Sequence, residues 1–84
     1  MTESVASVSR LVEMIARVLV DHPDDVHVHE FVWAGKYVIE LTVHPQDIAL
    51  VIGSNGRLAN AIRSLIGSMG ARQDKYYEFH VLES

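Results

Sequence analysis

Two glycines three residues apart, Gly53 and Gly56, separate two apolar stretches of this 84-residue chain. Because glycine has no Cβ atom, another molecule's backbone can approach closely at such positions. Gly56 and Arg57 stand where the next helix is expected to begin, and the free N–H groups and dipole of a helix N-terminus attract anions. Arg57 adds a full positive charge there. These residues predict a binding site for a sugar-phosphate backbone, with the bases lying over an adjoining apolar groove.

The residues around the glycines supply further candidate contacts. Ser54 and Asn55 can donate hydrogen bonds to phosphate oxygens. Ile52 either lines the groove or fills the core. Arg63 follows Arg57 by six residues, off one clean helix face, so it is either a second contact or an ordinary solvated arginine. The competing interpretation of the whole segment is a plain turn between two helices, since glycine is common in turns.

Other chemistries find little support. The chain has no cysteine, which excludes a disulfide, a thiolate nucleophile and a cysteine-based zinc site. His27 and His29 share a strand face, but no acidic ligand stands at a familiar spacing from them, so we expect them to be solvated and expect no metal or other cofactor. No arrangement of serine, histidine and carboxylate indicates a nucleophilic site. The chain is therefore expected not to be an enzyme.

Aromatic side chains form a second set of candidate contacts to nucleic acid. Trp33, Tyr37, Tyr76 and Tyr77 lie in or beside expected strands, where aromatic rings can stack on bases. Packing is the favoured interpretation for all four, because helices are expected to cover part of the sheet.

The pattern of apolar residues predicts the elements that hold the glycine loop. Helical spacing and strand alternation are both clear. The expected elements are a helix over 4–20, a turn over 21–25, strands over 26–32 and 36–44, helices over 45–52 and 57–69, and a strand over 76–82. A second glycine pair, Gly67 and Gly70, is interpreted as the end of the last helix. The expected fold is α+β, in the order α-β-β-α-α-β, a three-stranded mixed sheet with helices on one face.

Length and charge set further bounds. A chain of 84 residues forms one domain (1–84), able to bury about 60–65% of its unfolded surface. The formal net charge of −4 does not favour nucleic acid and predicts weak, salt-sensitive binding. The start of the chain does not look like a signal peptide, and no apolar run approaches the ~20 residues needed to span a bilayer. We expect a cytoplasmic protein without membrane contact.

The loop also carries a family resemblance. The segment Val51-Ile52-Gly53-Ser54-Asn55-Gly56-Arg57, followed by Ala61-Ile62-Arg63, resembles the signature of the KH domain. The element order resembles its prokaryotic, type II arrangement. The N-terminal helix, the turn Asp21-His22-Pro23-Asp24 and the segment Val43-His44-Pro45-Gln46-Asp47 are similar to the small bacterial single-KH-domain proteins of the KhpA (YlqC) family. One departure stands out, because that family usually has a lysine where this chain has Ser54.

The resemblance implies single-stranded RNA binding, with the GxxG loop at 53–56 touching about four nucleotides. It implies a bacterial RNA chaperone or post-transcriptional regulator, which pairs as a homodimer or as a heterodimer with a larger KH-containing protein of the Jag (KhpB) kind. The alternative is a protein–protein interaction or dimerisation module with only weak RNA affinity, which the acidic total and the missing lysine favour.

Overall fold

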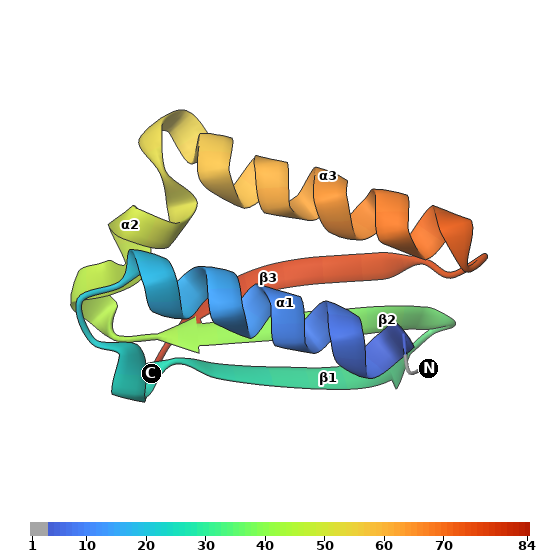
Figure 1. Cartoon of the computed structure of the whole chain (residues 1–84), viewed down its shortest axis with the longest axis horizontal. Coiled ribbons are helices and arrows are strands. Elements are labelled where there is room, and N and C mark those ends of the chain that lie inside the picture. The colour runs from blue at the N-terminus through green and yellow to red at the C-terminus, as the bar shows by residue number, and fades with distance from the viewer. Residues whose placement is uncertain (1–3) are drawn as a thin grey trace.

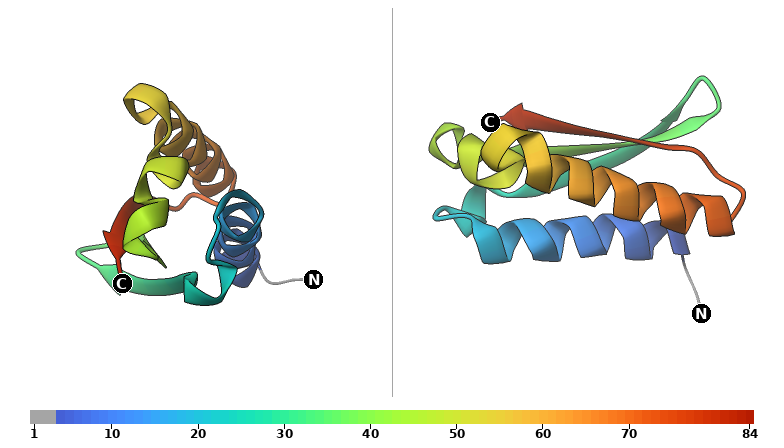
Figure 2. Two further views of the ribbon diagram at one scale, coloured as in Figure 1. Left: turned by 90° about the vertical axis from the view of Figure 1, so that its left-hand side faces the viewer. Right: turned by 90° about the horizontal axis from the view of Figure 1, so that it is seen from above.

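Three helices lie on one face of a three-stranded sheet, and the other face of the sheet is open (Figures 1 and 2). This computed structural model describes residues 4–84, with side chains from residue 8 onward. The elements are α1 (Ser4–Leu19), β1 (His27–Trp33), β2 (Lys36–Val43), α2 (Ile48–Ile52), α3 (Arg57–Arg72) and β3 (Tyr77–Glu83), with 3₁₀ turns η1 (Pro23–Asp25), η2 (Pro45–Asp47) and η3 (Ser54–Gly56). The predicted fold class and element order are confirmed.

The sheet has the order β1-β2-β3, so β2 is central and β3 is an edge strand. β1 and β2 form an antiparallel hairpin, in which Trp33 pairs with Lys36 beside the turn. β3 returns parallel to β2, with Tyr77 opposite Tyr37. The crossover between these two parallel strands contains α2, the glycine loop and α3, which places the loop at one end of the molecule (Figure 1).

The core lies between the sheet and the helices. β2 alternates as predicted, since Ile39, Leu41 and Val43 are buried towards the helices. Phe79 of β3 is buried in the same layer. The helices complete this cluster through Val8, Val12, Ala16, Val51, Ile62 and Ile66.

α1 buries a narrower face than its apolar residues cover. Val8, Val12 and Ala16, spaced four apart, are almost fully buried. Leu11 and Ile15, which belong to the same set of apolar residues at helical spacing, are only half-buried. α1 therefore presents an apolar flank away from the sheet.

The end of α3 differs from its prediction. Gly70 does not end the helix, which continues to Arg72. A Cβ atom on Gly70 would lie 2.6 Å from the backbone oxygen of Lys75 and 2.7 Å from the Tyr77 ring. Glycine is present here because the start of β3 packs directly against the helix. Two of the apolar residues at helical spacing in α3, Ala61 and Leu65, are exposed rather than buried.

Candidate nucleic-acid interface

The glycine loop is a tight link between two helices. α2 ends at Ile52, where Gly53 has φ 80° and ψ 172°. Asn55 (φ 55°) and Gly56 (φ 74°) then adopt left-handed conformations, which reverse the chain before α3 starts at Arg57. Glycine and asparagine are the residues that accept these conformations most readily. The local sequence therefore dictates the turn.

The two glycines are needed for different reasons. A Cβ atom on Gly53 would lie 2.8 Å from the Leu58 Cβ and 2.9 Å from the Leu58 backbone nitrogen, so α3 packs directly onto this glycine. A Cβ atom on Gly56 would meet nothing nearer than the Asn60 side-chain nitrogen at 3.8 Å. Gly53 thus brings the two helices together, and Gly56 supplies the left-handed turn on an open side.

Two of the loop's backbone N–H groups donate hydrogen bonds within the protein, and two do not. Gly53 N–H donates to Ala49 and Gly56 N–H donates to Gly53. The amides of Ser54 and Asn55 donate to no acceptor among residues 4–84, and both residues are exposed. No side chain caps α3 at Gly56. These N–H groups and the helix dipole remain free for an anion.

The two predicted arginines lie differently. Arg57 is exposed at the start of α3 and forms no ion pair with any described residue. Arg63 turns to the edge strand β3, where it donates to the Phe79 carbonyl oxygen at 3.2 Å and to Asn60 Oδ1 at 2.8 Å. Its guanidinium also lies 5.7 Å from the centroid of the Phe79 ring. Arg63 is therefore a positioned side chain between α3 and β3 rather than a freely solvated one.

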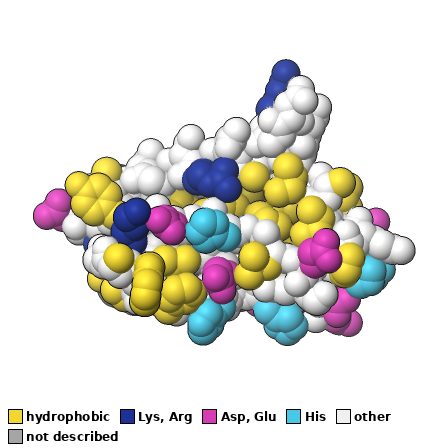
Figure 3. Space-filling model, turned by 180° about the vertical axis from the view of Figure 1, so that it is seen from behind, with side chains coloured by type: hydrophobic (Ala, Val, Ile, Leu, Met, Phe, Trp, Pro, Cys, Tyr) yellow, Lys and Arg dark blue, Asp and Glu magenta, His cyan; other side chains and the backbone are white. Residues whose placement is uncertain are grey.

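The surface between the loop and β3 is partly apolar. Ile52 and Leu58 are half-buried beside the loop, and Leu50 of α2 is 42% exposed. Figure 3, which views the molecule from behind, shows hydrophobic side chains exposed between Lys or Arg side chains on this part of the molecule. Ile52 thus contributes both to packing and to the surface, and the two alternatives raised by its position are not exclusive.

Charge along the chain is more segregated than the net value suggests. Residues 48–73 contain three arginines and no aspartate or glutamate, although the whole chain has 11 acidic residues. The loop and α3 therefore form a locally basic segment in an acidic protein. Counting charge in windows along the sequence would have revealed this, whereas the total obscured it.

A contact that fixes the start of α2 was not predicted from the sequence. Asp47, fully buried, accepts hydrogen bonds from the backbone and ring of His22, and the His22 ring stacks on His44 with centroids 3.9 Å apart. Burial by itself would raise the pKa of Asp47, but the hydrogen bonds from His22 and from the Asp21 backbone hold that pKa below its ordinary value. The contact ties the α1–β1 turn to the start of the helix that leads into the loop. Its sequence signal is a repeated His-Pro-x-Asp pattern at 22–25 and 44–47.

A helix-strand-strand-helix-helix-strand fold with a GxxG loop between its two middle helices defines a KH domain of the type II arrangement. A profile of the family described as "KhpA/KhpB, KH domain" matches residues 9–81, and the chain belongs to this family.

Relatives from several bacteria are similar along most of their length. The chain is 45% identical over 65 residues to RNA-binding protein KhpA of Clostridium perfringens, which covers 77% of this chain and 87% of the relative. It is 44% identical over 73 residues to RNA-binding protein KhpA of Halalkalibacterium halodurans, covering 87% and 96%. The Streptomyces coelicolor protein of the same name is 43% identical over 60 residues, covering 71% and 76%. The comparison with solved structures gives no match.

The family consists of KH-domain, RNA-binding proteins and not of enzymes, which agrees with the prediction that the chain is not an enzyme. Among residues 4–84, no three His, Asp or Glu side chains are grouped so that they could hold a metal ion. No helix in that range is long and apolar enough to cross a membrane.

Proposed function

We propose that this protein binds single-stranded RNA through the loop Gly53–Gly56 and the surface between α2, α3 and β3, as a chaperone or post-transcriptional regulator in the bacterial cytoplasm. The observation that carries the proposal is the loop itself, where unoccupied amides at Ser54 and Asn55 stand next to an unpaired Arg57. The KhpA relatives named as RNA-binding proteins support the same ligand.

The loop is suited to a phosphate backbone rather than to a base. Backbone N–H groups and a helix N-terminus favour negative charge without reading sequence. Ser54 carries a hydroxyl that can donate a further hydrogen bond, although it lacks the point charge of a lysine. Bases would then extend towards Ile52 and Arg63, which uses two of its five N–H donors within the protein. Because the loop contacts phosphates rather than bases, RNA binding should show weak sequence preference and strong dependence on salt concentration.

The sharpest test changes charge at Ser54 without disturbing the turn. Ser54 is exposed and its φ is not in the left-handed region, so Ser54→Lys and Ser54→Asp are both expected to fold. Ser54→Lys should tighten binding of a labelled six-nucleotide RNA at low salt, and Ser54→Asp should weaken it. Fluorescence anisotropy measures both affinities.

Ser68 provides the matched control, because it is also exposed but lies near the far end of α3. Ser68→Lys and Ser68→Asp change the net charge equally and should shift affinity much less. If the two positions gave equal shifts, binding would reflect net charge alone and the loop would not be the site.

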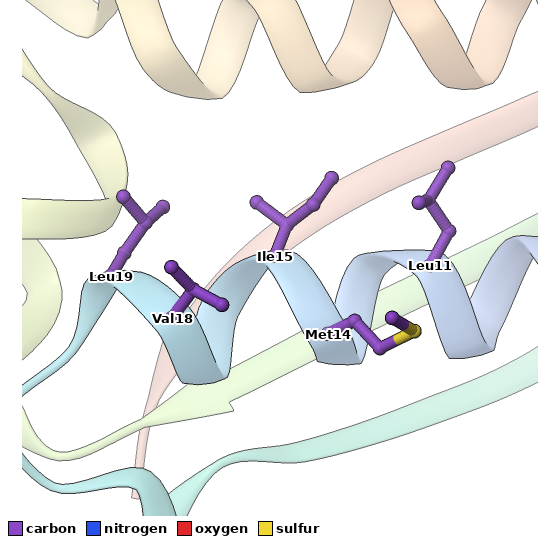
Figure 4. Close-up of a pocket in the computed structure, with 5 residues that line it drawn as sticks. All are labelled: Leu11, Met14, Ile15, Val18 and Leu19. Carbon is purple, nitrogen blue, oxygen red and sulfur yellow. The ribbon is translucent and has the colours of Figure 1, made fainter.

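Pairing is the second proposed function, and an exposed flank of α1 favours it. Five apolar side chains form a shallow hollow of about 310 Å³ there (Figure 4). Its lining consists of Leu11, Met14, Ile15, Val18 and Leu19. Val18 is 85% exposed and Met14 61% exposed, an unusual loss of apolar burial for a domain this small.

We propose that a second copy of the chain covers this flank. Arg10 and Asp21 are both exposed, and along the chain they lie just before and just after the apolar residues of this flank. Two copies packed with their helices antiparallel bring each Arg10 towards the partner's Asp21 and align the helix dipoles favourably. Because the family profile also describes KhpB, the KH domain of a larger KhpB-type protein is the alternative occupant of the same flank.

Light scattering during size-exclusion chromatography tests the pairing. The parent should elute as a dimer at high concentration, and Val18→Glu should elute as a folded monomer. Val32→Glu, at a residue 62% exposed on β1, is the control and should remain dimeric. Val18→Glu protein that still dimerised, or parent protein that stayed monomeric while binding a KhpB-type KH domain, would exclude a second copy as the occupant.

A further inference from the structure

The open face of the sheet carries two highly exposed aromatic side chains that lie away from the glycine loop. Trp33 at the end of β1 is 71% exposed, and Tyr76 just before β3 is 77% exposed. The four aromatics considered in the sequence therefore divide into two pairs. Tyr37 and Tyr77 face the helices and pack together with ring centroids 5.4 Å apart, as the packing interpretation predicts, whereas Trp33 and Tyr76 do not pack in this way.

The pairing of the strands places these two aromatics in one row with a lysine between them. Trp33 lies opposite Lys36 in the β1–β2 ladder. The Tyr76 carbonyl accepts a hydrogen bond of 2.7 Å from the Tyr37 amide, which sets Tyr76 against the same end of β2. Lys36 bonds Glu78 at 2.9 Å, and both belong to the open face because their strand neighbours Tyr37 and Tyr77 point to the helices. The row is Trp33, Lys36 and Tyr76, and we call it the aromatic row.

Its chemistry fits nucleobases. An exposed aromatic ring offers a flat surface on which any base can stack, and an ammonium beside it is placed to meet a phosphate. Lys36 is partly engaged by Glu78, whose pKa the Lys36 ammonium and the His80 ring lower. An ammonium has three donors, so this ion pair leaves others for a ligand.

The surroundings favour a nucleic acid over a protein partner. The apolar area extends along the sheet by one row only. The second row holds Phe31, which is half-buried, Val38, which is buried, and Glu78, and the third row presents His29, Glu40 and His80 on the open face. Figure 3 shows this change, with hydrophobic side chains gathered towards the hairpin end and histidine and acidic side chains over the middle of the sheet. A protein interface needs a continuous desolvated centre, and here the exposed ion pair of Lys36 and Glu78 lies between the rings on β1 and Tyr76.

We propose that the aromatic row is a second contact site for single-stranded RNA, on which bases outside the loop-bound segment stack. The inference rests on the proposed RNA binding and adds a site at the other end of the molecule. The charged and histidine side chains of Glu78 in the second row and of His29, Glu40 and His80 in the third confine the contact to the hairpin end.

The distance between the two sites makes the proposal depend on RNA length. The molecule is 35 Å long, with the glycine loop at one end and the β1–β2 turn at the other (Figure 1). At the stacked spacing of about 3.4 Å per nucleotide, a strand of about ten nucleotides covers that distance. At that spacing a six-nucleotide RNA covers about 20 Å and engages one site only, whereas an 18-nucleotide RNA covers about 60 Å and can engage both.

The experiment compares these two RNAs with the parent, with Trp33→Ala/Tyr76→Ala and with the control Val32→Ala, at low salt. The aromatic double variant should lose at least about fivefold of the affinity for the long RNA, the low end of what one stacked base contributes. Its affinity for the short RNA and its circular dichroism should match the parent. Because Trp33 is the only tryptophan, stacking should also quench the parent's fluorescence with the long RNA more than with the short one.

The outcomes separate this proposal from the previous one. Unchanged long-RNA affinity in the double variant, with Ser54→Asp still weakening both RNAs, overturns the aromatic row and leaves the loop site standing. A parent that binds neither RNA overturns the proposed function and with it this inference. A double variant that changes the oligomeric state but not RNA affinity assigns the row to a protein contact and also overturns the proposal.

Discussion

Gly53 and Leu58 are packed so closely that a Cβ atom on the glycine would lie 2.8 Å from the Cβ of Leu58. The dihedral angles of Gly53, φ 80° and ψ 172°, also belong to a region that is essentially restricted to glycine. Gly56, by contrast, is left-handed in open space. The two halves of the GxxG motif therefore contribute differently to the fold.

We predict that Gly53→Ala lowers the free energy of unfolding by about 2–4 kcal/mol, through strain and collision together. Gly56→Ala should cost only about 1 kcal/mol, the penalty of a left-handed alanine. Urea unfolding of the two variants measures the difference. Equal losses would show that α3 can move away from Gly53 without cost. Replacing Gly53 is thus a poor test of RNA contact, and Ser54 is the better position.

The two glycines of α3 offer a similar contrast. A Cβ atom on Gly70 would collide with the Lys75 carbonyl oxygen at 2.6 Å, whereas one on Gly67 would meet nothing within 4 Å. Gly67→Ala should raise the melting temperature, because alanine stabilises a helix interior by about 0.5–1 kcal/mol relative to glycine. Gly70→Ala should lower it by displacing the start of β3. A thermal melt of each variant by circular dichroism measures both changes, and a stabilising Gly70→Ala would contradict the close packing of β3 on Gly70.

These glycines also show how far the sequence alone could lead. Apolar periodicity and turn residues predicted every helix and strand to within a few residues, because each follows from local spacing. The end of α3 was misplaced because Gly70 looks like a helix terminator locally, while its real constraint comes from Lys75 and Tyr77 in the next strand. No pattern within the helix carries that information.

The residues of the candidate site also fall into two groups, those that the sequence predicts and those that only the fold reveals. The loop and Arg57 were recognisable because their chemistry is contained in consecutive residues. The position of Arg63 against the Phe79 carbonyl, and the ring of His22 against Asp47, depend on which segments the fold brings together. The exposure of Trp33 required knowing which sheet face the helices leave open.

The Asp47 carboxylate gives a pH-dependent prediction. Its pKa is lowered in the folded protein by hydrogen bonds from His22 and the Asp21 backbone, in spite of burial. A carboxyl whose folded pKa lies below its unfolded value stabilises the fold above about pH 4, and that contribution is lost as the pH falls through the folded pKa. Asp47→Asn should therefore be clearly less stable than the parent at pH 7, and the difference should shrink at pH 3.

Urea unfolding at the two pH values measures this, with Asp24→Asn in the exposed η1 turn as the control. The unfolding free energy of Asp24→Asn should equal that of the parent at both pH values. If the difference in unfolding free energy between the parent and Asp47→Asn stayed constant with pH, the loss of stability would come from altered packing and not from the loss of the carboxylate charge.

Arg57 gives the last prediction, which concerns salt. Each phosphate contact that a basic residue makes to a single strand adds about 0.7 to the slope of log affinity against log salt concentration. Arg57→Gln should reduce that slope by about this amount for the six-nucleotide RNA, and the affinities of parent and variant should converge as salt is raised. Because a phosphate contact carries no sequence information, the reduction should be the same for RNAs of different sequence. Arg72→Gln removes an equal charge from the opposite end of α3 and should leave the slope unchanged. Equal reductions in both variants would mean that the charge of α3 acts as a diffuse field, without a specific phosphate contact at the loop.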